Sequence, residues 1–297
     1  MRVVSLVFAL LAAATAFAQA PPSAQSQPQT PPQTLVREVV YNELHDHQRH
    51  GYWRYWIAQQ AEHQSRLSQQ VETADGPVAR LVSTGGRPLS GDAAELEGQK
   101  LRRVAGSPAE QARRRQEYAD DERRVGRILT LLPDAFLFEN AGEENGVRRM
   151  RFRPNPAYPA HSIEARIFHA MSGEIAIDTR MKRLARLEGH LEENVDFGYG
   201  LLGRLYKGGW FLMERSAVSD TDWKTVRLEI HMNGRALLFK TIARETSERR
   251  GGFESVPAGL SMVQGIALLG APPAQAAAQT HAGPGTPLQD TAFSVRR

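Results

Sequence analysis

The residues with the clearest capacity for chemistry are the histidines near the amino end of the sequence. His45, His47 and His50 lie close together around Asp46, and His63 follows further along. Metal ions need neutral imidazoles that converge on one point, and His47 and His50 could share one face of a helix. The interleaved polar residues are also typical of a solvated helix end, and no second acidic residue and histidine complete a ligand set. No metal ligand is therefore assigned.

A glycine-rich run, Gly198-Tyr-Gly-Leu-Leu-Gly203, matches the Gly-x-Gly-x-x-Gly pattern of dinucleotide-binding loops. Such a loop needs a strand before it and a helix after it, because the phosphates bind at the helix N-terminus. The residues from Arg204 to Phe211 instead have the pattern of a strand and a turn. Glycines at bends or bulges of a sheet explain the run better, so no nucleotide cofactor is predicted.

Nucleophile motifs are missing from the sequence. It has no cysteine and no Gly-x-Ser-x-Gly run. Two pairs of adjacent carboxylates occur, Glu143 with Glu144 and Glu192 with Glu193, but neighbours in sequence point to opposite sides of a strand. Only the fold could bring such groups together into a glycosidase-like pair. We assign no catalytic residue and no cofactor, and an envelope hydrolase that uses carboxylates or the histidines remains an alternative.

The amino terminus predicts export. Val3 to Ala18 contains no charged residue and ends in Ala16-Phe17-Ala18, the small-x-small pattern that signal peptidase cleaves. We expect cleavage after Ala18, because cleavage after Ala20 would leave Pro21 next to the cut. The apolar stretch is too short for a membrane span, and no later segment approaches the required length. The mature protein is therefore expected in the periplasm or secreted.

Composition limits the class of partner. The formal charge of +4 falls by one when the leader is removed, since Arg2 is the only charged residue in it. This mild positive charge suits an anionic membrane surface and does not indicate nucleic acid. Without cysteine there are no disulfides and no thiol for an acyl anchor. With 41% hydrophobic residues, the chain can bury a sizeable core.

Composition also divides the chain. Residues 19–33 are rich in Pro, Gln and Ser and predict a disordered linker after the signal peptide at 1–18. Residues 271–297 are dominated by Pro, Ala, Gly and Gln and predict a disordered tail. The stretch 34–270 between them is expected to form a single α+β domain.

Three helices are predicted in the first half of this domain. Apolar residues recur at helical spacing from Leu35 to Gln48. A second helix is expected from Asp92 to Gly106, and a third from Ser107, as N-cap before Pro108, to Pro133. Arginines and acidic residues at three- and four-residue spacing on the third helix favour a salt-bridged surface.

Strands dominate the rest of the domain. Val226, Leu228, Ile230 and Met232 alternate with polar residues, as in a half-buried strand, and Asn233-Gly234 predicts a hairpin turn directly after it. Further short strands with one polar face indicate a meandering antiparallel sheet. We therefore expect an α+β fold, a large curved antiparallel sheet or half-barrel with an N-terminal helix and two covering helices inserted between strands.

Several runs resemble a group of uncharacterised exported proteins common in Acidobacteria. They are Phe152-Arg-Pro-Asn-Pro-Ala-Tyr158, the stretch from Glu164 to Asp178, Val195-Asp-Phe-Gly-Tyr-Gly-Leu-Leu-Gly203, Lys207-Gly-Gly-Trp210 and Ala236-Leu-Leu-Phe-Lys-Thr241. The resemblance extends from about Leu35 to Leu269. It implies export but no particular activity.

The order of features is also similar to the lipoprotein-localisation fold of the bacterial envelope. The run Gly173-Glu-Ile-Ala-Ile-Asp178 followed by Lys182-Arg-Leu-Ala-Arg-Leu187 looks like the strand-turn-strand unit of that family. This resemblance implies a half-open barrel that receives acyl chains and has no catalytic residues. The Arg-rich helix at 107–132 departs from that family's pattern.

A wide apolar sheet face must be covered by helices, by another sheet or by a ligand. We expect an exported, non-catalytic protein that binds or carries a lipid, an acyl chain or another apolar small molecule, with a membrane surface or an envelope protein as a further partner. A structural or assembly role in the cell envelope is the main alternative. The candidate ligand face comprises Trp210, Leu212, Val226, Leu228, Ile230 and Phe239, although ordinary core is the commoner role for such residues.

Overall fold

Thirteen strands join in one antiparallel sheet in the part of the chain that the computed structural model describes, residues 30–46, 51–61, 64–197, 203–236 and 240–269. The predicted signal peptide, residues 19–29 of the predicted linker and the tail lie outside these ranges, and the last two linker residues already belong to the helix Pro32–Leu44. The strands are β1 Tyr52–Ala61, β2 Gln64–Val71, β3 Val78–Thr84, β4 Arg87–Pro88, β5 Phe136–Glu144, β6 Val147–Pro154, β7 Met171–Asp178, β8 Arg183–Leu191, β9 Val195–Phe197, β10 Gly203–Leu205, β11 Trp210–Ala217, β12 Trp223–Ala236 and β13 Lys240–Val256.

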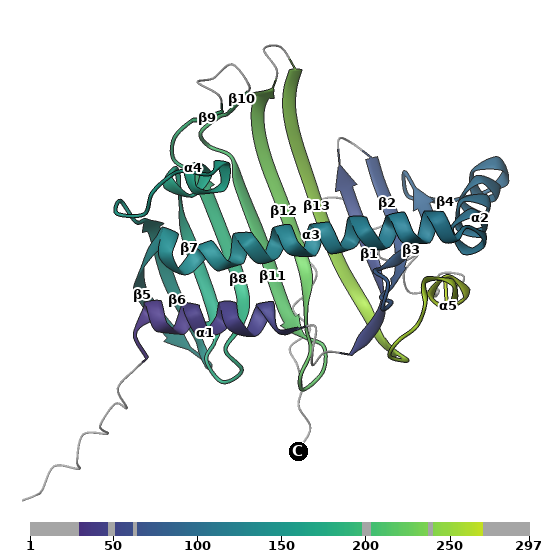
Figure 1. Cartoon of the computed structure of the whole chain (residues 1–297), viewed down its shortest axis with the longest axis horizontal. Helices are drawn as coiled ribbons and strands as arrows, with labels where there is room; N and C mark the ends of the chain where they lie inside the picture. Colours follow the sequence, from purple (N-terminus) through teal and green to yellow (C-terminus); the bar gives the residue numbers. More distant parts are fainter. Residues whose placement is uncertain (1–29, 47–50, 62–63, 198–202, 237–239, 270–297) are drawn as a thin grey trace, which may run out of the picture. The chain divides into compact units, whose positions relative to one another are not determined.

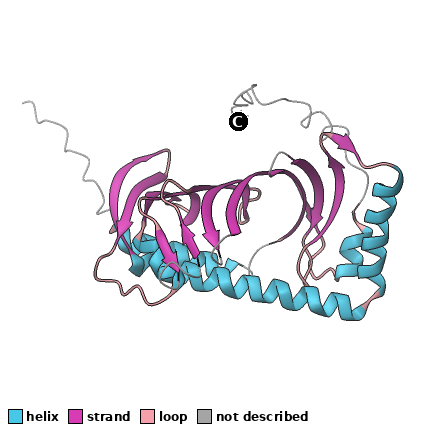
Figure 2. Ribbon diagram, turned by 90° about the horizontal axis from the view of Figure 1, so that it is seen from above, coloured by secondary structure: helices cyan, strands magenta, loops and turns pink. Residues whose placement is uncertain are grey.

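The first and last long strands meet inside the sheet. Along the main path the order is β4-β3-β2-β1-β13-β12-β11-β8-β7-β6-β5, while β10 pairs with the end of β12 and β9 with β10 (Figure 1). The sheet is curved, and helices lie along its concave side (Figure 2). The predicted α+β class, with one large curved antiparallel sheet, is confirmed.

Five helices are described: α1 Pro32–Leu44, α2 Gly91–Gly106, α3 Pro108–Ala135, α4 Ile163–His169 and α5 Met262–Ala267. The N-terminal α1 packs on the sheet, and α2 and α3 are inserted between β4 and β5, as predicted. The hydroxyl of Ser107 accepts a hydrogen bond from the backbone N–H of Glu110, which caps α3 at 3.3 Å. The helix continues past Pro133 to Ala135, so the predicted end at Pro133 is wrong by one half-turn.

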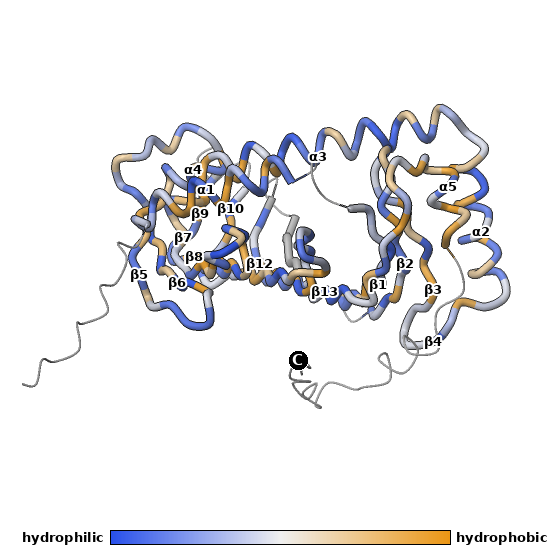
Figure 3. Tube along the Cα trace, turned by 90° about the horizontal axis from the view of Figure 1, so that it is seen from below, coloured by the Kyte–Doolittle hydropathy of each residue, from blue (hydrophilic) through white to orange (hydrophobic). Residues whose placement is uncertain are grey.

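Helix α3 is polar over most of its 28 residues, and only Pro133 and Ala135 in it are buried (Figure 3). Its arginines pair with acidic residues of the same helix, as predicted: Arg113 with Glu110 and Glu117, Arg114 with Glu110, Arg123 with Asp120, and Arg124 with Asp121. A helix of this kind is stabilised largely by its own pairs and can cross an open space.

Buried apolar side chains gather in separate clusters. The largest joins α1, α4 and strands β5–β8, and includes Val36, Phe136, Met150 and Ile177. A second cluster packs α2 and α5 on β2 and β3 through Val71, Val78, Val104, Met262 and Leu269. A small third cluster contains Trp56 and Leu67. The two main clusters therefore lie at opposite ends of the strand order.

The predicted hairpin turn at Asn233-Gly234 is wrong. Both residues continue β12, where Asn233 pairs with Ala243 and Gly234 with Ile242 of β13. A Cβ on Gly234 would lie 2.6 Å from the carbonyl oxygen of Arg204 in β10. The glycine is explained by this close approach of a third strand and not by a turn, a role that sequence spacing cannot reveal.

Candidate functional site

The concave face of the sheet carries the candidate site and is called the inner face. Cross-strand register places Ile175, Leu187, Met213, Leu228 and Glu248 opposite one another along it. Ile175 belongs to the cluster that packs against α1, which fixes this row on the helix-covered side. The row runs from strand β7 to strand β13. Its last two members, Leu228 and Glu248, lie on β12 and β13, beyond the strands on which α1 mainly packs.

At the β5–β8 end the inner face is filled. Two aromatic rings cover glycines of the neighbouring strands: a Cβ on Gly173 would lie 2.7 Å from Phe152, and one on Gly189 would lie 2.6 Å from Phe211. An enclosed apolar cavity of about 20 Å³ remains between α1, α3 and β5–β8. That volume is about enough for one water molecule, so no acyl chain fits there without rearrangement.

The central strands β12, β13 and β1 differ from this filled end. Leu228 and Ile230 of β12 and Ile57 of β1 lie on the inner face and are only half-buried. In the described part of the chain they belong to none of the three apolar clusters. Apolar side chains in the middle of the inner face are thus only partly covered and lie outside the packed clusters.

Helix α3 passes along this open part of the inner face (Figure 2). Near its N-terminus, Arg115 pairs with Asp75 at 2.7 Å, and the ring of Tyr118 packs against Gly76. Nearer its C-terminus, Leu129 and Leu132 pack on the large cluster. Val125 lies on the same helical stripe as these leucines but is 52% exposed. The apolar stripe of α3 is therefore packed at its C-terminal end and free in its middle.

Polar groups from β1, β2, β12, β13 and α3 border the open region. The hydroxyl of Tyr55 accepts a hydrogen bond from Gln70, and the guanidinium of Arg250 lies 6.0 Å from the centre of its ring. Burial raises the pKa of Tyr55, and burial raises that of Tyr118 to about 12, so both hydroxyls stay protonated at physiological pH. Lys224 pairs with Glu72 at 2.9 Å nearby. These groups can donate hydrogen bonds to a polar head group.

A buried ionic network fastens the C-terminal end of α1 to the sheet. The carboxylate of Glu43 accepts hydrogen bonds from Arg183 of β8, Arg215 of β11 and the backbone N–H of Leu184. Arg183 also pairs with Asp46 at 2.6 Å. The side chains of Glu43 and Arg183 are less than one-tenth exposed. The network positions α1 over the filled end of the inner face.

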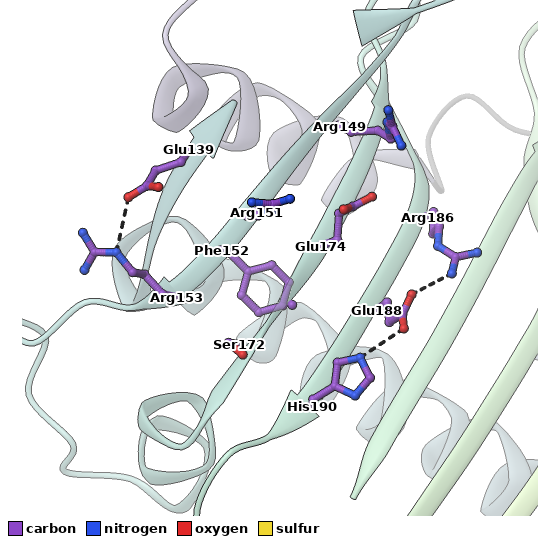
Figure 4. A pocket seen from close by; sticks show the side chains of 11 residues that line it. Glu139, Arg149, Arg151, Phe152, Arg153, Ser172, Glu174, Arg186, Glu188 and His190 are labelled. Atoms are coloured by element: carbon purple, nitrogen blue, oxygen red, sulfur yellow. Dashed lines mark hydrogen bonds and ion pairs between the residues drawn. The ribbon is translucent and has the colours of Figure 1, made fainter. Parts of the chain in front are cut away.

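The opposite, outer face of strands β5–β8 contains a shallow depression of about 750 Å³. Charged side chains line it, and several pair with one another (Figure 4). Arg153 bonds to Glu139 at 3.3 Å, and Arg186 bonds to Glu188 at 2.6 Å. The hydrogen bond from Arg186 is the main reason why the pKa of Glu188 lies below its usual range.

Comparisons with known proteins add a distant structural likeness. No protein-family model matches the sequence, and no curated protein matches it. The structure is similar to a DUF1329 family protein from Desulfovibrio piger, with a TM-score of 0.27 and 9% sequence identity, over 78% of this chain and 96% of that one. The likeness is distant and assigns no family by sequence.

The predicted ligand face divides between the two sides of the sheet. Trp210 and Leu212 pair with His231 and Glu229 and lie on the outer face, where Leu212 is buried. Leu228 and Ile230 pair with Met213 and Phe211 and lie on the inner face. The structure therefore divides the described members of the predicted set between two faces, because the register between β11 and β12 cannot be read from spacing.

The two other predicted members of that face are placed differently. Val226 lies at an irregularity of the β11–β12 pairing, where Glu214 pairs with Arg227 and Arg215 with Thr225. Phe239 lies outside the described residues.

The two predicted carboxylate pairs do not converge. The side chains of Glu143 and Glu192 lie near opposite ends of β7, since Glu143 contacts Thr179 after the strand and Glu192 contacts Ser172 at its start. Eight residues of strand span roughly 25 Å, too far for a carboxylate pair. Within the described ranges no group of His, Asp and Glu could hold a metal ion.

The predicted histidine cluster and glycine-rich loop are described only in part. His45 bonds to the carbonyl oxygen of Tyr41 at 2.7 Å, while His47, His50 and His63 lie outside the described residues. Residues 198–202 are likewise outside, and strand β10, not a helix, begins at Gly203. The strand agrees with the strand pattern predicted after the glycine-rich run.

Residue spacing in the sequence did not predict the polar groups around Tyr55 or the ionic network around Glu43. Tyr55 lies in an aromatic run of β1 to which no site residue was assigned, and Glu43 and Arg215 are 172 residues apart. Only the alternation in β1 could have shown that Tyr55 and Ile57 share a face. None of the described helices has the length and hydropathy needed to cross a bilayer.

Proposed function

We propose that the protein is an exported, non-catalytic carrier that binds an apolar ligand such as an acyl chain between α3 and the central strands. The observation that carries this proposal is the set of partly exposed apolar side chains on the inner face that lie outside the packed clusters. Leu228 and Ile230 are half-buried on the sheet, and Val125 is exposed on the apolar stripe of α3. Large apolar surfaces left open in a folded protein commonly mark binding sites.

The energy of such binding follows from the area that it would bury. Each buried methylene contributes about 0.8 kcal/mol, so eight methylenes on this face would contribute about 6 kcal/mol before ordering costs. The polar border formed by Tyr55, Gln70 and Arg250 suits the polar end of an amphiphile. Helix α3 is stabilised largely by ion pairs within the helix and makes few contacts with the sheet, so a ligand could bind between α3 and the sheet without unfolding the helix.

The test starts with native mass spectrometry of the mature chain from Gln19 onward, purified from a bacterial periplasm, with its organic extract analysed alongside. We expect about one lipid per chain. A dansylated fatty acid serves as the probe in solution. Leu228→Gln combined with Ile230→Gln should weaken its binding at least tenfold.

A matched control replaces exposed apolar residues elsewhere, Leu96→Gln with Val263→Gln, and should leave binding unchanged. Both pairs must first show cooperative unfolding. A lipid-free mass together with no saturable binding of the probe would contradict the carrier proposal. The structural or assembly role would then be favoured, and the search would turn to protein partners.

A further inference from the structure

We propose that the depression on the outer face of β5–β8 binds a phosphate group through Arg149 and Arg151. This site is separate from the inner face, which lies on the other side of the sheet. Arg149, Arg151 and Arg153 occupy alternate positions of β6, so all three project from the outer face. All three line the depression (Figure 4).

The pairing of the surrounding charges leaves two of these arginines available. Arg153 is held by Glu139 at 3.3 Å. In the described part of the chain, neither Arg149 nor Arg151 has a carboxylate within ion-pair distance. Residues two apart on a strand are roughly 6.6 Å apart along it, so the two guanidinium groups repel each other. An anion between them would relieve that repulsion.

The acidic residues of the depression do not replace such an anion. Glu188 is bound to Arg186 at 2.6 Å and to His190 at 3.0 Å. Glu174 pairs with Arg151 in the strand register but forms no ion pair with it. Its carboxylate is the group that a bound phosphate would have to displace or avoid.

The guanidinium groups that line the depression favour phosphate as the ligand. A planar guanidinium donates two parallel hydrogen bonds to phosphate oxygens, and two guanidinium groups can hold one phosphate from two sides. Ser172 also lines the depression, but its hydroxyl donates to Glu192, so the two arginines are the donors that the proposal uses. The volume of about 750 Å³ falls in the range of roughly 300–1,000 Å³ typical of small-molecule sites. Phosphate of this kind is carried both by soluble metabolites and by lipid head groups.

The experiment separates these two sources. Inorganic phosphate is titrated at low ionic strength into the full mature chain, and the arginine Nε–Hε signals are followed by NMR. In parallel, the chain is sedimented with phosphatidylglycerol vesicles and with phosphatidylcholine vesicles. The test variant is Arg149→Gln with Arg151→Gln. The control is Arg87→Gln with Arg103→Gln, which removes the same charge at exposed positions on β4 and α2.

We expect the test variant to raise the dissociation constant about tenfold and the control to leave it within about twofold. Binding of free phosphate that only the test variant loses assigns a soluble phosphate ligand. Sedimentation with phosphatidylglycerol vesicles alone, lost in the same variant, assigns a lipid head group. Equal losses in test and control, or no binding to either probe, would overturn the proposal. None of these outcomes changes the acyl-chain test on the inner face.

Discussion

Replacing Glu43 with glutamine should be among the most destabilising single changes in the protein. The carboxylate of Glu43 is buried and accepts hydrogen bonds from two arginines and one backbone N–H. Glutamine keeps the shape but removes the charge and one acceptor oxygen. Among the described residues, Arg215 then has no acidic partner, and Arg183 keeps only Asp46.

The magnitude follows from the burial of this network. Removing one member of a buried ion pair typically costs about 3–5 kcal/mol. That is a large fraction of the free energy of unfolding of a typical domain. The matched control is Glu139→Gln, which removes a carboxylate from the exposed pair with Arg153. Exposed pairs contribute at most about 1 kcal/mol.

Urea unfolding of both variants, followed by circular dichroism, measures the difference. We expect the midpoint for Glu43→Gln to fall several times further than that for Glu139→Gln, with unchanged slopes. Hydrogen exchange should show the loss of protection concentrated in α1 and β8. Equal midpoints for the two variants would refute the argument that burial makes the Glu43 network essential to the position of α1.

Three further changes test other parts of the structure. Gly173→Ala should destabilise the protein by about 2 kcal/mol, because its Cβ would lie 2.0 Å from the Glu188 carbonyl oxygen, whereas Gly106→Ala should be neutral in the same urea assay. Burial alone would raise the pKa of Asp222, but hydrogen bonds from Ser219, the Gly51 N–H and Thr221 outweigh it and hold that pKa below its ordinary value. Asp222 therefore stabilises the fold above about pH 4 and ceases to as pH falls through its folded-state pKa, so Asp222→Asn should reduce stability near neutral pH, by an amount that shrinks as the pH falls through that pKa. In an absorbance titration, Tyr118 should ionise near pH 12, and Tyr118→Phe should remove that step.

The outcomes that would contradict these predictions are specific. Equal stabilities of the Gly173 and Gly106 variants would mean that the strands can move apart without cost. A stability difference for the Asp222 variant that persists in acid would show that its hydrogen bonds act without its charge. Ionisation of Tyr118 near its ordinary value of about 10 would place its hydroxyl in water and weaken the description of the polar border.

Local patterns in the sequence determined the elements and the fold class. Ser107 and Pro108 mark the start of α3, because a side-chain acceptor and a fixed φ satisfy the first turn wherever the helix lies. The alternating residues of β12 predicted a half-buried strand, and the salt-bridged surface of α3 followed from charges at three- and four-residue spacing. These signals depend on neighbours in sequence, so a single sequence was enough.

Tertiary structure decided which residues share a face and which groups meet. Trp210 and Ile230 both fit an apolar strand pattern, but the register between β11 and β12 places them on opposite sides of the sheet. The Asn233-Gly234 dipeptide predicted a turn, whereas Gly234 is needed where β10 approaches β12. That approach is a non-local contact, so the local sequence does not show it. Glu43 meets Arg215 across 172 residues of chain. Register and long-range pairing arise from the packing of the whole sheet, and no local spacing encodes them.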